Sequence, residues 1–600
     1  MIRCNVLALL LLMLMVPQVG RAVNYSWAAD DDGEWTTPAN WNSIGYPCTA
    51  SDNATIRRNF ADDITVTLGV PLKINNLLLG NDSGTSRLRL TSLASPFVAK
   101  TTLYTGGVLE VGPGVSVTNT TLSLVGTNFV VRLDGGARFC TPSIFSPVVT
   151  NATTLFAAPD GADRGGTIDG SGQAWNLAYA LSGGKNTAGT NTVWIFDNVT
   201  VSNTPLTVSR SPAMNGNTTA VFRNGARMFM CANQDFTIAN ISTNAVARIE
   251  GPGTILTGTG RNLNVSTGAG LNNRMIVTDG ARVYDWGHVM MGRTDFSCDN
   301  RLEISKGGSL VNPTGSLRIC YQGKGTNNVA EVSEGGLVEV KYLWVNYDPR
   351  GEVAGNGVIV HDGGVLQFAP SYDISLTSDA FVRIADSTLA FRGTETADVN
   401  CNAVASGPGL FEYSGNNAFR LVNAKNVKAA TQTYTFAPVV GSPKNWGRLE
   451  MVDGITEYRG KTGDTLTIGS DATGSTGSML CSNTSASVSI PFALASNGTL
   501  KMSAATLSLT AGATLDGAVE IDLDRLTVGE GVLKMDSVTL GENSVLRLSG
   551  AGTDAVLLAS ETSIRGAFAA VEGVPAGYSV RVKDKSIVLR KDKGMVIVLF

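Results

Sequence analysis

A short block of residues recurs along the chain about every 28 positions. Its clearest copies run from an asparagine through alternating apolar residues to a polar residue, a Gly-Gly or Gly-Ala pair and more alternation. The turn glycine or asparagine falls at positions 106, 135, 165, 198, 225, 251, 280, 307, 335 and 363, at nearly even spacing. A period held over so many intervals indicates a repeat architecture.

Each block has the two-residue period of a β-strand. Apolar residues stand three and five positions before the turn, as at Met275 and Val277, with polar residues beside them. Side chains two positions apart share one face of a strand. Another apolar residue follows three positions after the turn, as at Leu310. Glycine or asparagine at the turn permits the positive φ of a sharp corner.

One block cannot bury its apolar face alone, whereas stacked blocks bury a continuous column. The sequence therefore predicts an all-β chain that folds as a right-handed parallel β-solenoid, with one rung of about 28 residues per repeat. Ten rungs at a strand spacing of about 4.8 Å give a core about 50 Å long. The alternative is a row of β-sandwich domains, but each of those needs about 100 residues.

Asparagine recurs seven residues before the turn in seven copies. We expect these side chains to stack as a hydrogen-bonded ladder at a corner of the solenoid. The alternative is the general preference of asparagine for turns. The seven residues are Asn128, Asn191, Asn244, Asn273, Asn300, Asn328 and Asn356.

The N-terminus has the features of a secretory signal peptide. Arg3 precedes an uninterrupted apolar run at 6–16, and Gly20 and Ala22 place small residues at a cleavage site. We expect cleavage near Ala22 and secretion to the outside or to the outer cell surface. The run of about 11 residues is shorter than the roughly 20 that cross a bilayer, and no transmembrane span is expected in the mature chain.

Four regions are expected along the chain. Residues 1–22 are the signal peptide, and 23–100 form an aromatic N-terminal cap with the first rungs. Residues 101–480 are the repeat region. Residues 481–600, where turns come closer together, form a short-rung solenoid that ends in a β-hairpin cap, because exposed solenoid ends template aggregation.

Composition excludes several classes of protein. Charged residues make up 16% of the 600 residues and hydrophobic residues 43%, which is not the balance of a disordered chain. The net charge of −4 offers no basic surface for nucleic acid. The two histidines, His288 and His361, disfavour a histidine-rich metal site. Seven scattered cysteines of the mature chain are expected to be mostly thiols, with Cys298 and Cys320 as one candidate disulfide.

The start of the mature chain carries a separate aromatic block. Its pattern is Gly33-x-Trp35, Asn40-Trp41, Gly45-x-Pro47 and Asp52-x-Ala54-x-Ile56, after Trp27. Together with the repeats, over residues 27–370, it resembles the secreted bacterial autotransporter-passenger-like, or autotransporter-associated β-strand-repeat, proteins. The resemblance implies export and an extracellular or surface solenoid, and it implies no defined activity.

Two features of this block have alternative interpretations. The three tryptophans either seal the first rung or stack on sugar rings. Asp30, Asp31, Asp32 and Glu34, with Asp52 nearby, form either a solvated acidic turn or a Ca²⁺ site, since Ca²⁺ prefers several carboxylate and carbonyl oxygens.

The search for catalytic residues starts from segment 165–175, which resembles the Ile-Asp-Gly rung of pectin-degrading β-helix hydrolases. Those enzymes need Asn-Thr-Asp, a paired Asp-Asp and Gly-His-Gly together on adjacent rungs, and the sequence lacks this combination. Glycosidases need two carboxylates about 5–10 Å apart, and Asp279, Glu334 and Asp362 share the turn column. The same column also fits ordinary turn chemistry.

Arginine follows the turn by two positions in several copies. Arg138, Arg227 and Arg282 would form a line of guanidiniums on one outer face, which could contact acidic glycans. The alternative is a solvated rung surface.

The sequence predicts no catalytic, cofactor-binding or metal-binding residue. The expected function is that of a non-enzymatic secreted or surface-exposed β-solenoid with a structural or adhesive role, whose partners are polysaccharide or cell-surface components. The alternative is a carbohydrate-binding or carbohydrate-active β-helix protein of the polysaccharide lyase or glycoside hydrolase kind. Aromatic or carboxylate side chains that converge on consecutive rungs would separate the two.

Overall fold

A computed structural model describes most of the chain. It covers residues 22–57, 62–93, 95–145, 151–177, 179–182, 185–188, 191–209, 217–230, 235–293, 296–347, 353–377, 379–393, 410–414, 417–424, 433–434, 445–459, 463–470, 476–526 and 532–592. The expected signal peptide up to residue 21 lies outside the described residues, as do Cys231 and Cys401.

The expected fold class is confirmed. The chain is all-β, with 58% strand and rungs about 27 residues apart, and the solenoid has about 17 turns. There are more turns than the ten blocks counted from the sequence, because rungs before residue 106 and after residue 363 lack the glycine signature. Among the described residues, no helix has the length and apolarity needed to cross a bilayer.

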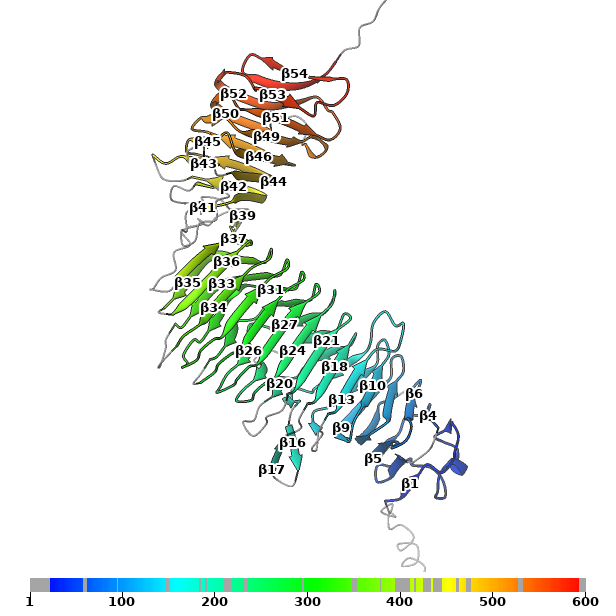
Figure 1. Ribbon diagram of the computed structural model, residues 1–600. Helices are drawn as coiled ribbons and strands as arrows, with labels where there is room; N and C mark the ends of the chain where they lie inside the picture. Colours follow the sequence, from blue (N-terminus) through cyan, green and yellow to red (C-terminus); the bar gives the residue numbers. More distant parts are fainter. Residues whose placement is uncertain are drawn as a thin grey trace, which may run out of the picture. The chain divides into compact units, whose positions relative to one another are not determined.

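The chain divides into two compact units, residues 1–234 with 242–247, and residues 235–241 with 248–600. In the first unit, parallel strands stack into two main faces (Figure 1). One face contains β2 (Gly33–Glu34), β4 (Ile64–Leu68), β6 (Ser86–Leu90), β8 (Gly107–Val111), β10 (Phe129–Leu133), β13 (Thr153–Ala157), β18 (Val193–Asp197) and β21 (Thr219–Arg223). The other contains β1 (Asn24–Ser26), β3 (Asn53–Arg57), β5 (Lys73–Gly80), β7 (Phe97–Tyr104), β9 (Ser116–Val125), β11 (Arg138–Cys140), β14 (Thr167–Asp169), β19 (Thr200–Ser202) and β22 (Arg227–Phe229).

Short strands complete the rungs of the first unit. A third face holds β12 (Ile144–Phe145), β15 (Trp175–Asn176) and β20 (Leu206–Ser209). One rung also carries an antiparallel hairpin, β16 (Tyr179–Ser182) and β17 (Lys185–Ala188). This insertion lengthens its rung, because the hairpin lies between Thr153 and its partner Val193, whereas Val193 pairs with Thr219 on an ordinary rung.

The second unit has the same organisation. One parallel face contains β27 (Arg274–Thr278), β30 (Arg301–Ile304), β32 (Val329–Val332), β34 (Asn356–Val360), β36 (Ala380–Ala385) and β38 (Leu410–Ser414). The other contains β25 (Ile255–Thr257), β28 (Arg282–Tyr284), β31 (Ser309–Ile319), β33 (Leu337–Val345), β35 (Val365–Leu376), β37 (Thr388–Arg392), β39 (Ala418–Val422), β42 (Arg448–Tyr458), β44 (Gly477–Val488), β46 (Gly498–Ser503), β49 (Ala518–Asp522), β51 (Val545–Ser549) and β53 (Ala570–Glu572).

A third face of the second unit begins with β23 (Phe236–Ala239), β26 (Asn262–Ser266) and β29 (His288–Met291), and the later halves of β31, β33 and β35 continue it. Further along, two sides complete each rung. One is formed by the later halves of β42 and β44, by β47 (Thr506–Leu509) and by the first halves of β50 (Leu533–Leu540) and β52 (Ala555–Arg565). The other is formed by β43 (Leu466–Ile468), β45 (Phe492–Leu494), β48 (Ala513–Leu515) and the later halves of β50 and β52.

Antiparallel strands close the C-terminal end of the described chain. There β54 (Tyr578–Lys583) and β55 (Ser586–Lys591) form a hairpin, and β55 pairs antiparallel with β52. The rungs that precede this end include short ones. Gly477 pairs with Gly498, and Thr499 pairs with Ala518, so both steps are shorter than the usual rung of about 27 residues.

The register corrects part of the sequence count. Ser86 pairs with Gly107, and Val108 with Val130, so these early rungs are also shorter than the usual one. Gly106 precedes β8, whereas Gly135 follows β10. These two glycines therefore stand at different corners, and the interval between them is not a rung.

The Gly-Gly pair of the repeat has a physical explanation in the second unit. Gly335 has a φ of 74°, in the left-handed region. A Cβ on the next residue, Gly336, would lie 2.3 Å from the carbonyl oxygen of Ile304 on the preceding rung. The first glycine therefore turns the chain, and the second lets two backbones approach.

The expected asparagine ladder exists, but it holds four of the seven residues. The ladder consists of four fully buried residues, Asn273, Asn300, Asn328 and Asn356. The side-chain Nδ2 of each of the first three donates to Oδ1 of the next asparagine, at 3.0, 2.7 and 3.0 Å. By contrast, Asn128, Asn191 and Asn244 have φ values of 56–58°. They occupy left-handed corners outside this ladder.

The described cysteines are thiols. Cys48, Cys140, Cys298, Cys320 and Cys481 are all free, so the candidate disulfide between Cys298 and Cys320 is wrong. The backbone of Cys298 forms an isolated parallel β-bridge with Leu271 at one corner. The backbone amide of Cys320 donates to the Met291 carbonyl at another corner. Burial raises the pKa of the Cys320 thiol to about 11 and that of Cys481 to about 12.

Candidate functional site

The N-terminal tryptophans form a buried cap. Trp27, Trp35 and Trp41 are 2%, 0% and 4% exposed, and Trp35 and Trp41 pack edge to face with ring centroids 4.9 Å apart. Trp35 Nε1 donates to the Pro47 carbonyl at 2.9 Å. Rings buried in this way are not available to stack on a sugar, so the capping interpretation holds.

The acidic residues beside the cap do not converge. Asp30, Asp31 and Asp32 are exposed, whereas Asp52 is 3% exposed and accepts the Cys48 and Thr49 amides. Within the described ranges, no three His, Cys, Asp or Glu side chains gather closely enough to hold a metal ion. The cluster therefore has the geometry of a solvated turn with one buried acceptor.

The carboxylates of the turn column serve as corner residues. Asp279, Glu334 and Asp362 are exposed, with φ values of 54°, 48° and 49°. Asp362 Oδ2 also lies 2.8 Å from His361 Nδ1, and Glu331 Oε1 lies 2.9 Å from Nε2. This arrangement is an ion-pair network across two rungs that engages Asp362, while Asp279 and Glu334 are exposed residues at left-handed corners.

His361 gives the fold a measurable pH dependence. Burial lowers the pKa of His361, but the hydrogen bonds that its ring donates to Asp362 and Glu331, together with the negative charges of these carboxylates, outweigh burial, and the net pKa is raised. Stabilisation by the charged imidazole is therefore complete below the unfolded pKa of about 6.5 and is lost as pH rises through the folded value. We expect His361→Gln to destabilise the protein by up to about 1 kcal/mol at pH 5.5 and negligibly at pH 9. Thermal unfolding at both pH values checks this, and an equal loss at both would contradict it.

The Ile-Asp-Gly rung is also structural. Asp169 is 6% exposed and accepts from Arg138, from the Ser171 amide at 2.8 Å and from Asn203 Nδ2 at 3.1 Å. Burial alone would raise the pKa of Asp169, but these hydrogen bonds hold it below its usual value. A carboxylate held by three structural hydrogen bonds, with a lowered pKa, is a poor general base.

The arginines after the turns share a column but do not form a line. Thr167 and Thr200 follow Arg138 in register before Arg227 is reached. Arg282 pairs with Ile255 on one side and Ser309 on the other. Intervening rungs therefore separate the guanidiniums.

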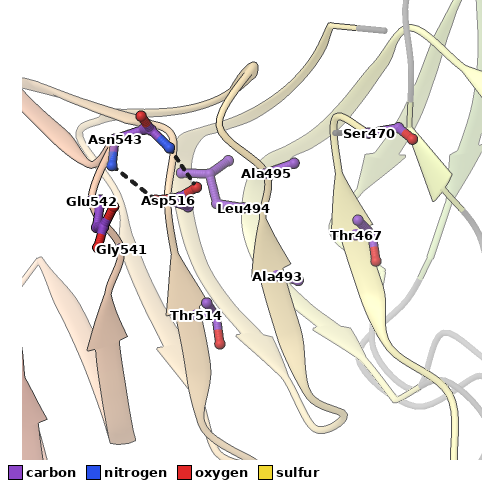
Figure 2. Close-up of a pocket in the computed structure, with 10 residues that line it drawn as sticks. All are labelled: Thr467, Ser470, Ala493, Leu494, Ala495, Thr514, Asp516, Gly541, Glu542 and Asn543. Atoms are coloured by element: carbon purple, nitrogen blue, oxygen red, sulfur yellow. Dashed lines mark hydrogen bonds between the residues drawn. The ribbon is translucent and has the colours of Figure 1, made fainter. Parts of the chain in front are cut away.

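A groove of about 640 Å³ opens near the C-terminal end (Figure 2). Thr467, Ala493 and Thr514 line it on consecutive rungs. Its Asp516 is fixed, because Asn543 N donates to Oδ1 at 2.9 Å and Asn543 Nδ2 to Oδ2 at 3.0 Å. The other carboxylate of the lining, Glu542, is exposed, and most of the remaining side chains are small.

The strongest candidate site lies on the third face of the second unit. We call it the aromatic platform, and it consists of Arg318, Tyr321, Tyr342, Trp344 and Tyr347. Arg318 lies on β31 and Trp344 opposite it on β33, in register. Tyr321 and Tyr347 each follow a corner residue with positive φ, Cys320 at 50° and Asn346 at 55°. The same corner thus places the two tyrosines on consecutive rungs.

The rings of the platform stack on one another. Tyr321 and Tyr347 are 5.4 Å apart with an interplanar angle of 9°, and Trp344 and Tyr347 are 4.8 Å apart at 25°. Trp344 Nε1 donates to Asp373 Oδ2 at 2.9 Å, which fixes the indole. Tyr347 is 46% exposed. The stack is therefore ordered by its own contacts and leaves an aromatic surface open to solvent.

A guanidinium is built into this platform. The Arg318 Cζ atom lies 4.4 Å from the Tyr321 ring centroid and 4.6 Å from that of Trp344. Arg318 Nε donates to Ser316 Oγ at 2.9 Å, and Nη2 lies 3.2 Å from His288 Nε2. Since a guanidinium can only donate, His288 Nε2 accepts and its Nδ1–H donates to Ser316. Burial lowers the pKa of His288, and the charges of Arg318 and Arg293 lower it further.

Sequence reasoning missed the platform although a signal was present. Residues 318–321 read Arg-Ile-Cys-Tyr and residues 344–347 read Trp-Val-Asn-Tyr, one rung later. This second repeat lies outside the Asn-to-Gly-Gly block. No protein-family model and no curated protein sequence matches the chain.

Proposed function

We propose that the chain is a secreted or surface-exposed, non-enzymatic β-solenoid with an adhesive role, which holds polysaccharide or other cell-surface glycan. One observation carries the proposal: aromatic side chains converge on the outer surface of consecutive rungs, and Tyr347 is 46% exposed. Amphipathic rings in a fixed geometry suit sugars, which present both C–H faces and hydroxyls.

The engaged carboxylates support a binding role over a hydrolytic one. Asp169 and Asp516 are occupied by structural hydrogen bonds, whereas hydrolysis needs a free acid and base pair. The signal-peptide features at 1–22 and the resemblance to autotransporter-associated repeat proteins support export.

Retention on insoluble polysaccharides tests the proposal. The purified chain is incubated with a panel of soluble and insoluble glycans, and both bound protein and newly released sugar ends are measured. We expect retention without released ends, and at least a fivefold weaker retention of Tyr347→Ala. The control is Phe229→Ala, which removes another exposed aromatic ring, 40% exposed, far from the platform in sequence. Released sugar ends, or equal retention of both variants, would overturn the proposal.

A further inference from the structure

We propose that the ligand of the aromatic platform is an acidic polysaccharide, whose uronate carboxylate binds the Arg318 guanidinium while a sugar ring stacks on Tyr347. This inference rests on the proposed adhesive function and names the ligand class. The first observation concerns the ion pairs that the other arginines of the chain form.

Across the outer surface, arginines are paired with a carboxylate, usually on the next rung. Arg274 is bidentate to Glu303 at 2.8 and 2.7 Å. Arg223 and Arg547 have similar partners at 2.7 and 2.9 Å. Further pairs are Arg138–Asp169, Arg383–Glu412 and Arg420–Glu450. Neutralisation by a neighbouring carboxylate is therefore common among the described arginines.

Arg318 is instead half-buried against aromatic rings. Among the described residues it has no carboxylate partner, and its neighbours are two aromatic rings, a serine, a histidine and Arg293. Burial lowers the pKa of Arg318, and the Arg293 charge also lowers it. A half-buried cation without a counter-ion costs free energy, and this cost is recovered when an anion binds.

The platform also contributes the geometry that an acidic sugar needs. Two of the five N–H donors of Arg318 are used by described groups, Ser316 and His288. The guanidinium, whose Cζ lies 4.4 and 4.6 Å from the two ring centroids, is planar and keeps its remaining donors in one plane, which matches a carboxylate. The Lys341 ammonium lies 5.0 Å from the Tyr342 centroid and adds a further positive charge at the same patch.

Asp373 brings one negative charge to the platform. Its Oδ2 accepts from Trp344 Nε1 at 2.9 Å and orients the indole, and no ion pair joins it to a described cation. The described charges around the platform, Arg318, Lys341 and Arg293 against Asp373, remain net positive. A neutral glycan would leave this charge without a partner, whereas a uronate compensates it.

Affinity electrophoresis with a matched pair of polymers tests the inference. The purified chain is run through gels with polygalacturonate or with the same polymer after its carboxyl groups are reduced. We expect retardation by the acidic polymer alone, weakened by salt. Arg318→Gln should bind at least tenfold more weakly, since a charge-assisted hydrogen bond is lost. Arg274→Gln, which removes a cation already paired with Glu303, should change binding less than twofold.

The outcomes separate this inference from the proposed function. Equal retardation by both polymers, or unchanged binding by Arg318→Gln, overturns the acidic ligand. Retention on neutral glycans alone also overturns it but leaves the adhesive proposal standing, whereas no retention on any glycan of the panel overturns both. Circular dichroism checks the fold of each variant, and Tyr347→Ala, at an exposed position, repeats the test if Arg318→Gln does not fold.

Discussion

Asn328→Leu is expected to destabilise the rungs around it by about 3–5 kcal/mol, because several buried polar groups lose their partners. The Asn328 side chain is completely buried. Its Oδ1 accepts from Asn300 Nδ2 at 2.7 Å, and its Nδ2 donates to the Ser297 carbonyl at 2.7 Å and to Asn356 Oδ1 at 3.0 Å. Leucine keeps the volume but orphans these groups, each at a cost of about 1–3 kcal/mol.

The matched control is Asn217→Ala. Asn217 is exposed, and its Nδ2 donates to Asn191 Oδ1 at 2.7 Å. Water replaces this bond when it is lost, so a cost below about 1 kcal/mol is expected. Because unfolding of a long repeat array need not be all-or-none, hydrogen exchange of the amides in residues 296–347 is the measurement. Equal protection in the two variants would refute a stabilising role for the ladder.

Trp35→Ala is expected to open the N-terminal cap and to cause aggregation. Trp35 is fully buried against Trp41 and Phe97 and donates a hydrogen bond to Pro47. Truncation of a buried tryptophan costs about 3–5 kcal/mol. Loss of the cap exposes strand edges at the end of the stack, and these recruit other chains.

Thermal unfolding followed by near-ultraviolet circular dichroism and light scattering measures this effect. Trp344→Ala is the control, because that indole is half-buried on the aromatic platform and its removal leaves no internal cavity. We expect a large fall in Tm and early scattering for Trp35→Ala, and a small change for Trp344→Ala. If Trp35→Ala melts like the wild type, the tryptophans are not a structural cap.

The repeat of about 28 residues and the alternation of apolar and polar residues were sufficient to predict the fold, because every second side chain of a strand lies on the same, buried face. The sequence could not predict the register between strands. Gly106 and Gly135 look equivalent as turn residues, yet strand pairing places them at different corners. For the same reason the asparagines divided into two columns, since a shift of one residue at a corner moves a side chain from the interior to the left-handed turn.

The candidate site was harder to predict than the fold. Trp27 and Trp344 are both tryptophans in strand-like sequence, but one is buried in a cap and the other faces outward. The alternation of buried and exposed side chains cannot be extended across a corner such as Asn346, because its positive φ reverses the side on which the next residue lies. Electrostatic pairing is equally invisible in sequence, because the partner of Arg274, Glu303, lies a full rung away.

The hairpin β16–β17 shows how this scaffold can accept new segments. The rung that carries it makes a long detour between Thr153 and Val193, yet the pairing on both sides stays parallel and in register. Hydrogen bonds between strands fix the sequence register of each face, whereas the segment at a corner only has to bring the chain back to the next strand in that register. The segment between 177 and 191 is therefore a natural insertion port, where a foreign epitope or a small domain could be grafted and displayed without disturbing the stack.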